Sequence, residues 1–164
     1  MAGPARRAAG AGSRKAGKQA AGAAASGVGP LQGFLGYNVR RAQLAVSRDF
    51  QRSVAQGKIR PVVFSILVLA EAHPGIAQVD LARQLALDKA SVVALIDRLE
   101  AGGLVERRRS TQDRRRQGLF LTEAGQSRLQ GLKEEVARHE RRFVERYSPA
   151  ELALLVELLQ RLYE

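Results

Sequence analysis

Arginine is concentrated in one short segment of this 164-residue chain. Six arginines lie between Arg107 and Arg116, in the sequence RRRSTQDRRR. A guanidinium group stays charged at physiological pH and donates N–H groups in a fixed fork, which suits paired hydrogen bonds to phosphate or carboxylate oxygens. The segment is therefore a solvated loop, a disordered tail or an anion-binding device. The elements around it decide between these interpretations.

The whole chain is strongly basic. Lys and Arg outnumber Asp and Glu by 27 to 16, which gives a net charge of +11 and a pI near 11.1. Such a protein is attracted to polyanions, with nucleic acid the first candidate and an anionic membrane surface the second. The absence of cysteine excludes disulfides, thiolate metal sites and thiol redox switches. No apolar run is long enough to cross a bilayer, so we expect a cytoplasmic protein without a membrane partner.

Residues 1–30 differ in composition from the rest of the chain. They contain eleven Ala, seven Gly, five basic residues and no acid. No periodic apolar face can be drawn on them, so we expect a disordered basic tail rather than an export signal. Attraction of DNA without sequence preference and a solubilising role are both compatible with this tail.

Two helices are expected before the middle of the chain. Apolar residues recur at spacings of three and four from Leu31 to Val54, which predicts one continuous helix ended by Gly57. Its opposite side carries Tyr37, Arg41, Leu44 and Arg48. Pro61 then opens a second helix, VVFSILVLAEA, which the segment HPG closes.

A pair of shorter helices and a hairpin are expected next. The pattern predicts a helix over residues 78–85, a tight turn, Asp88 as the N-cap, and a helix over residues 89–101. The second helix has an apolar face of Val92, Leu95, Ile96 and Leu99, and another face of Ala90, Ser91, Ala94 and Arg98. The segments LVERRR and GLFLT then predict two strands that flank the arginine-rich tip STQDRRRQ.

The C-terminal part predicts two more helices. Thr122 is expected to cap a long helix, and SPAE supplies a capping box of Ser148 and Glu151 with Pro149 at the first helical position. The last helix, LALLVELLQRLYE, is apolar nearly all round. A helix of that kind must pack on several sides, and a second subunit is the natural partner.

The order of a short helix, a turn, a longer helix and a charged hairpin is that of a winged helix-turn-helix. The second helix of such a pair fits the major groove, and an arginine at the tip of the hairpin enters the narrow, negative minor groove. We therefore interpret the arginine-rich segment as a wing. The fold class expected is mainly α with a small β-hairpin wing, in a winged helix-turn-helix head joined to a helical dimerisation domain.

The segment IAQVDLARQLALDKASVVALIDRLEAGGLVERRRSTQDRRRQGLFLTEAG resembles the DNA-binding core of the MarR family of bacterial transcriptional regulators. The resemblance rests on LDKASVVALIDRLEAGGLVERR, on DRR at the wing tip and on LTEAG, and it extends over about residues 31 to 164. It implies an obligate homodimer on a pseudo-palindromic double-stranded operator. The expected parts are a tail (1–30), an N-terminal dimerisation helix (31–57), the DNA-binding head (58–122) and C-terminal dimerisation helices (123–164).

The resemblance also assigns DNA-binding residues. Asp113 and Arg115 match the wing's Asp-x-Arg pattern, in which the acid shapes the wing and the arginine enters the minor groove. Many family members have Thr and Arg where this chain has Val93 and Ala94. We therefore expect contacts to thymine methyl groups and phosphates to contribute more of the DNA affinity here. The expected DNA-binding residues are Gln78, Lys89, Ala90, Ser91, Val93, Ala94, Arg98, Asp113, Arg114 and Arg115.

The family commonly senses small aromatic acids in a crevice between the dimerisation helices and the head. The segment LGYNVRRA is similar to members that respond to aromatic acids or their coenzyme A thioesters. We therefore expect an effector of that kind at Tyr37, Arg40, Arg41 and Leu44, and a repressor that the effector releases from DNA. The alternative role for the arginines is an interface salt bridge with an acid of the partner helix.

The sequence gives little support for an enzyme, because no acid–base pair and no phosphate-binding glycine loop can be recognised. His73 in a helix-ending turn and His139 in a charged helix are typical of structural or solvated histidines, so we expect no metal and no cofactor. Two rival functions remain: a ligand-independent architectural DNA-binding protein, and a helical interaction module that uses the terminal helices.

Overall fold

The protein is represented by a computed structural model that describes residues 29–109 and 117–164. The predicted tail of residues 1–30 lies almost entirely outside the described residues. The chain forms two compact units, Met1–Asn38 and Val39–Glu164. Only the end of the first unit is described, and the head with its flanking helices belongs to the second.

The described part of the first unit is a 3-10 helix, η1 (Gly29–Gly33), followed by the start of α1 (Leu35–Ser53). The Asn38 side chain donates hydrogen bonds to the carbonyls of Gln32 and Phe34, at 2.7 and 2.9 Å. The α-helix begins at Leu35, and the prediction that it includes Leu31 is wrong. Pro30 and Gly33 are poor α-helix residues, and η1 accommodates both.

The C-terminal end of α1 also differs from the prediction. The helix ends at Ser53, and the short 3-10 segment η2 (Ala55–Gly57) follows, so Gly57 is not the residue that stops α1. Ala55 and Gln56 have φ values of 48° and 53°, a left-handed conformation that costs non-glycine residues energy. The backbone N–H of Ala55 donates to the Glu135 carboxylate of the long helix α5 (Glu123–Val144), which holds this turn in place.

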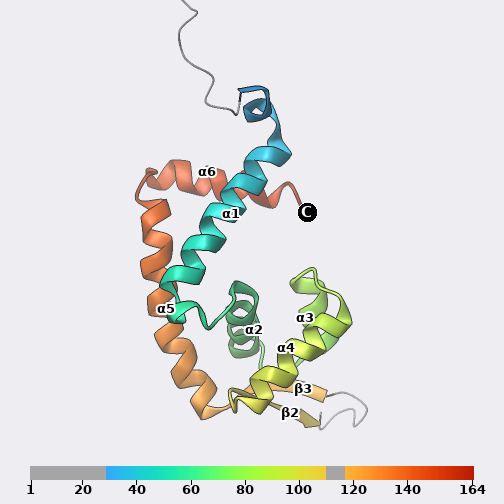
Figure 1. Cartoon of the computed structure of the whole chain (residues 1–164). Coiled ribbons are helices and arrows are strands. Elements are labelled where there is room, and N and C mark those ends of the chain that lie inside the picture. Colours follow the sequence, from blue (N-terminus) through green and yellow to red (C-terminus); the bar gives the residue numbers. More distant parts are fainter. Residues whose placement is uncertain (1–28, 110–116) are drawn as a thin grey trace, which may run out of the picture. The chain divides into compact units, whose positions relative to one another are not determined.

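The head is built from helices α2 (Pro61–Ala72), α3 (Gln78–Gln84) and α4 (Lys89–Ala101) together with strands β1 (Ile76–Ala77), β2 (Val105–Arg109) and β3 (Gln117–Leu121). The described residues form a three-stranded antiparallel sheet in the order β1-β3-β2. The predicted helix pair and hairpin are confirmed. Figure 1 shows α4 running toward this sheet and α5 leaving from it.

Strand β1 was not predicted, because two residues carry no periodic signal. Its register places Ile76 opposite Leu119 and Ala77 opposite Gly118. A Cβ atom at Gly118 would lie 2.7 Å from the carbonyl oxygen of Gly75, and Gly75 has a φ of +86°. Two glycines thus allow the turn after α2 to lie against the second strand of the hairpin.

Two helices follow the hairpin: α5 (Glu123–Val144) and α6 (Pro149–Gln160). The predicted caps are confirmed. Thr122 Oγ1 accepts from the Gly125 N–H at 2.9 Å, and Ser148 and Glu151 form the capping box of α6. These hydrogen bonds also lower the pKa of the Glu151 carboxyl, mainly through the backbone N–H of Ser148.

The buried core lies in the head and along α5. It includes the predicted inward face of α4 together with buried residues of α3 and α5, which pack on α2 and on the middle of the sheet. The side chains buried most completely are Val54, Ile66, Leu67, Leu81, Val92, Ile96, Val105, Leu119, Leu129, Leu132 and His139. This single cluster fixes α4 relative to the hairpin, which is the geometry that a DNA-binding head requires.

Candidate nucleic-acid interface

Helix α4 is fixed at its N-terminus by Asp88. The Asp88 carboxylate accepts the Ser91 backbone N–H at 2.8 Å and the Ser91 hydroxyl at 2.5 Å. Hydrogen bonds from Ser91 lower the pKa of the Asp88 carboxyl. The apolar face of α4 is buried at Val92, Leu95, Ile96 and Leu99, as the sequence predicted. The helix is therefore held by its cap and by its core face, and its outer face is left for a ligand.

The residues predicted to bind DNA lie on α4, apart from Gln78 and the residues of the wing tip. Five of them are exposed and Val93 is half-buried, while Gln78 is half-buried as the first residue of α3. The exposed residues are Lys89, Ala90, Ser91, Ala94 and Arg98. Small side chains over most of this face allow close approach to a groove floor, and Lys89 and Arg98 place a cation at each end. Their contacts with DNA remain a prediction.

The hairpin that forms the wing is present, but its tip is not described. The register pairs Val105 with Leu121 and Arg109 with Gln117, so the two strands are in the order expected for a wing. Asp113, Arg114 and Arg115 lie outside the described residues. Their predicted roles in the minor groove therefore stay predictions.

Two arginines at the start of the arginine-rich segment are engaged within the protein. Arg108 forms an ion pair with Glu106 and lies over the Phe120 ring, 4.9 Å from its centre. The Arg107 guanidinium bonds to Asp97 at 2.5 Å and to the Glu100 carboxylate, both on α4. Burial alone would lower the pKa of Arg107, but the hydrogen bonds and charges of Asp97 and Glu100 outweigh it and raise that pKa. The sequence predicts these arginines in the strand LVERRR and not at the tip, which β2 confirms, but it does not predict that Arg107 pairs with α4.

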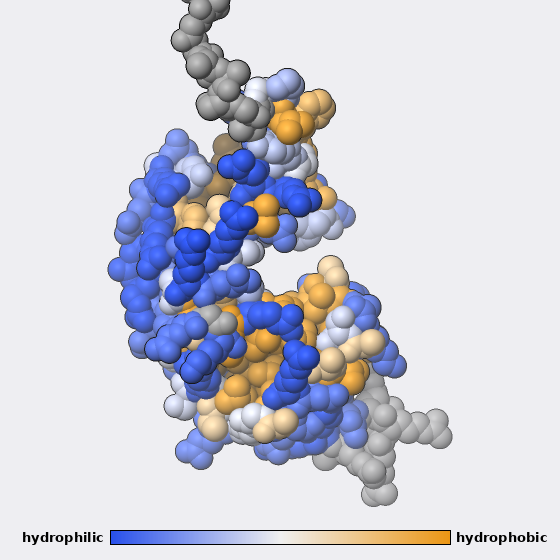
Figure 2. Space-filling model, viewed as in Figure 1, coloured by the Kyte–Doolittle hydropathy of each residue, from blue (hydrophilic) through white to orange (hydrophobic). Residues whose placement is uncertain are grey.

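The head also contains a hollow that the sequence analysis missed. It has a volume of about 250 Å³ and is lined by Lys58, Ile59, Arg60, Val63, Leu95, Arg98, Leu99 and Leu104. Figure 2 shows hydrophobic residues at the surface over α2 and α4, with hydrophilic residues beside them. The lining combines three cations with an apolar floor and includes no acid. The signal in the sequence was the pair Lys58 and Arg60 directly before Pro61.

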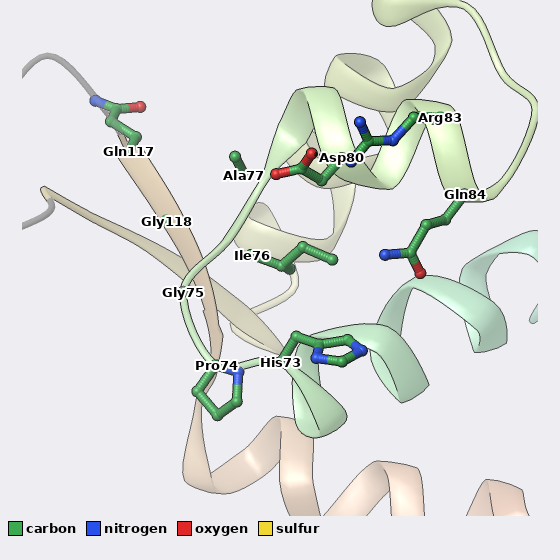
Figure 3. A pocket seen from close by; sticks show the side chains of 10 residues that line it. All are labelled: His73, Pro74, Gly75, Ile76, Ala77, Asp80, Arg83, Gln84, Gln117 and Gly118. Carbon is green, nitrogen blue, oxygen red and sulfur yellow. Dashed lines mark hydrogen bonds and ion pairs between the residues drawn. The ribbon is translucent and has the colours of Figure 1, made fainter.

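A second hollow lies between the turn after α2, helix α3 and the start of β3. Its volume is about 420 Å³, and Figure 3 shows the residues that line it. Here the cation Arg83 is paired with Asp80 at 2.6 Å, within the same lining. Asp80 therefore balances the charge of Arg83 in this hollow. The cations of the hollow at Lys58 and Arg60 have no acid in the same lining, so that hollow is suited to an anion.

The residues predicted to bind the effector lie on α1. Tyr37 is half-buried, and Arg40, Arg41 and Leu44 are exposed. Their spacing of three and four places them along one face of the helix, as expected. Tyr37 belongs to the first unit and the other three to the second. Whether they form one effector site is untested and stays a prediction.

No group of three or more His, Cys, Asp or Glu side chains in residues 29–109 and 117–164 is placed to hold a metal ion. No helix in that part of the chain is long and apolar enough to cross a membrane. His73 is exposed in the turn after α2, and His139 is buried against Asp49, at 2.8 Å.

The winged head, its exposed α4 face and its basic hairpin define a helix-turn-helix DNA-binding protein. Comparison with known proteins makes the assignment specific. The model of the MarR family matches residues 59–116. A proposed transcriptional regulatory protein for the hcr operon of Thauera aromatica is 36% identical over 136 residues, which cover 82% of each chain. The chain belongs to the MarR family of transcriptional regulators.

Solved structures agree with this assignment. The transcriptional repressor CouR bound to a 23-mer DNA duplex has a TM-score of 0.79 and 38% identity, over 84% of this chain and 98% of that one. CouR bound to p-coumaroyl-CoA has a TM-score of 0.74 and 37% identity, over 85% of this chain and 99% of that one. The predicted fold class, a winged helix-turn-helix with flanking helices, is confirmed.

Proposed function

We propose that this regulator is a homodimeric repressor that binds a pseudo-palindromic operator and is released from it by an aromatic acyl-coenzyme A thioester. The observation that carries the proposal is its similarity, at 37–38% identity, to CouR in both a DNA-bound and a p-coumaroyl-CoA-bound form. The exposed face of α4 and the basic hairpin support the DNA-binding part. The cationic hollow and the arginines of α1 support the anionic ligand.

On DNA, α4 enters the major groove with Lys89, Ser91 and Arg98 as its polar and charged contacts. Ala90, Val93 and Ala94 offer methyl groups, which suit contact with thymine methyls rather than hydrogen-bonded recognition of bases. Gln78 at the start of α3 contacts the backbone, and Arg115 enters the minor groove beside the wing. Most of the affinity then comes from phosphate contacts, so it depends on salt concentration.

Dimerisation uses the terminal helices, over residues 31–57 and 123–164. None of the residues of α6, which lies wholly within the described chain, is buried. Its apolar side chains are exposed on more than one face, and Leu154 is 53% exposed. Covering a half-exposed leucine gains on the order of 1 kcal/mol, so several such residues favour a partner strongly. A second copy of the chain is the occupant that we propose.

The effector is an amphipathic anion, because a coenzyme A thioester joins an aromatic acyl group to several phosphates. Two places on the protein suit such a molecule. One is the face of α1 with Arg40 and Arg41, and the other is the hollow with Lys58 and Arg60 above Val63. Arginine side chains in both places, and Lys58 in the hollow, offer hydrogen bonds to phosphate or carboxylate oxygens.

The experiment that tests this function begins with selection of duplexes from a randomised pool at about 150 mM salt. The wild-type protein should enrich one pseudo-palindrome, with half-sites about one helical turn apart. The bound duplex is then titrated with p-coumaroyl-CoA, benzoyl-CoA, p-coumarate and free coenzyme A. We expect release by an aromatic thioester and not by free coenzyme A.

Two outcomes would contradict the proposal. If no duplex is enriched, the sequence-specific part of the proposal is wrong, and binding to all duplexes alike would then indicate an architectural DNA-binding protein. If a duplex is enriched but no aromatic thioester or acid releases it, the effector assignment is wrong. A thousandfold loss of DNA affinity requires about 4 kcal/mol of coupling free energy, above the range of about 1 to 3 kcal/mol that is typical of such switches, so a smaller release is compatible with the proposal.

A further inference from the structure

We propose that Arg107 is a positioning residue for DNA binding: it fastens the first strand of the wing to α4 and offsets part of the negative charge of two carboxylates beside the DNA-facing side of that helix. The inference rests on the proposed DNA-binding role of α4. It separates Arg107 from the arginines at the tip of the hairpin, which are expected to touch DNA directly.

Arg107 connects β2 and α4 through three hydrogen bonds. Its guanidinium donates to Asp97 Oδ1 at 2.5 Å and to the carboxylate of Glu100, and its backbone N–H donates to Glu100 Oε1 at 3.0 Å. Asp97 and Glu100 lie one turn apart on α4. Figure 1 shows the end of α4 beside β2, where this cluster lies. One guanidinium group thus fixes the distance between the recognition helix and the wing.

The two carboxylates lie close to the residues predicted to face DNA. Asp97 follows Val93 and Ala94 by four and three residues, so it lies on the same side of the helix, and its side chain is 56% exposed. A negative charge there repels the DNA phosphates unless a cation neutralises it. Arg107 supplies that cation.

Arg107 is poorly placed to contact DNA itself. Only 17% of its side chain is exposed, and the guanidinium is held by both carboxylates. The charges of Asp97 and Glu100 raise its pKa above the value for a free arginine, so it stays protonated throughout any binding experiment. A phosphate would have to displace two carboxylates in order to reach it.

The test compares variants on the duplex selected by the wild-type protein, with a scrambled duplex as the non-specific probe. Arg107→Gln should weaken specific binding about tenfold, because it leaves Asp97 and Glu100 without their cation. The slope of log affinity against log salt should not decrease, whereas loss of a phosphate contact lowers it by about 0.9. The triple variant Asp97→Asn, Glu100→Gln, Arg107→Gln removes the carboxylates as well, and it should bind within about threefold of the wild type.

Two further variants guard the interpretation. Arg107→Lys keeps the cation without the fork, so it should bind more weakly than the wild type but lose less than about tenfold in affinity, and this can be measured even if Arg107→Gln proves too unstable. Arg83→Gln removes an arginine that is paired with Asp80 on α3, and it should bind like the wild type.

Wild-type affinity in Arg107→Gln would overturn the inference. So would a salt slope reduced by about 0.9 together with a triple variant that stays as weak as Arg107→Gln, since Arg107 would then be a phosphate contact. Failure of the wild-type protein to select any duplex would instead contradict the proposed function. The two failures are therefore distinguishable.

Discussion

The Nδ1 atom of His139 lies 2.8 Å from Oδ2 of Asp49, although the two residues are 90 positions apart in the chain. His139 is only 2% exposed and lies edge-on to the rings of Phe50 and Phe143. Arg142 donates to the same carboxylate at 3.0 Å. This cluster joins the last turns of α1 to α5, so the helix that precedes the head and the helix that follows it are tied together.

The first prediction concerns Asp49. The hydrogen bond from His139, opposed by burial and aided by Arg142, lowers the pKa of the Asp49 carboxyl from its ordinary value of 3.8. A lowered pKa stabilises the fold above pH 3.8, and this contribution is lost as the pH falls through the lowered value. Asp49→Asn should therefore be less stable than the wild type at pH 7, and the difference should shrink below about pH 4. Urea unfolding at one fixed protein concentration measures this, and a difference that does not vary with pH would contradict it.

The second prediction concerns Gly125 in the first turn of α5. A Cβ atom there would lie 1.9 Å from the carbonyl oxygen of Leu104, which is backbone and cannot move away easily. Gly125→Ala should destabilise the protein by about 1 to 3 kcal/mol or more. Gly131→Ala on the same helix is the matched control, because nothing lies within 4 Å of its added Cβ. That variant should be more stable than the wild type by about 0.5 to 1 kcal/mol, and similar losses in both variants would show that close packing at Leu104 is not the cause.

The third prediction concerns the wing tip. Arg115→Ala should weaken binding of the selected duplex by about 1 to 3 kcal/mol, the scale of one good groove contact. Gel-shift titration at fixed salt measures the loss, with circular dichroism as a check on the fold. Unchanged affinity in a folded variant would remove Arg115 from the minor groove.

The fourth prediction concerns assembly. Deletion of residues 152–164 removes most of α6 and its exposed leucines, so it should abolish the dimer and, with it, specific DNA binding. A single head buries too little DNA surface for operator affinity. Sedimentation at micromolar concentration decides the point. A stable, folded monomer that still selects one duplex would show that α6 is not the dimerisation helix.

The fifth prediction locates the effector. If the α1 face binds it, Arg40→Ala and Arg41→Ala should each weaken p-coumaroyl-CoA binding in calorimetry and leave the dimer and the ligand-free operator complex intact. Lys58→Ala and Arg60→Ala are the matched variants for the hollow between α2 and α4. We expect the loss at α1. Normal binding in both α1 variants, or their dissociation into monomers, would make those arginines interface residues.

Much of the fold could be predicted from the sequence, because its signals are local. Asp88, Thr122 and Ser148 are caps that any reader of the chain can place, and Pro61 and Pro149 mark helix starts. The errors were at α1, where an apolar stripe continued across Gly33 and Val54 although the backbone leaves the α-helix at both. Periodicity reports which side chains face the core, and it does not report left-handed turns such as Ala55 and Gln56.

The site was less accessible to sequence reasoning. Residues on α4 could be assigned because one helix carries them all. The cluster of Asp97, Glu100 and Arg107 could not, because it depends on the register of β2 against the end of α4. The hollow at Lys58 and Arg60 likewise brings together a turn and a helix about 35 residues apart, for which the sequence holds no periodic signal.

The junction between the wing and α5 has one residue, Thr122, between the last residue of β3 and the first of α5. Its hydroxyl donates to the carbonyl of Gly103 at 2.6 Å, and its backbone N–H donates to Leu104 at 3.1 Å. These two hydrogen bonds couple the long helix α5 directly to the turn that ends α4. A tilt of α5 at its far end must be passed to the recognition helix rather than absorbed on the way, and half-site spacing on the operator would be the quantity that changes.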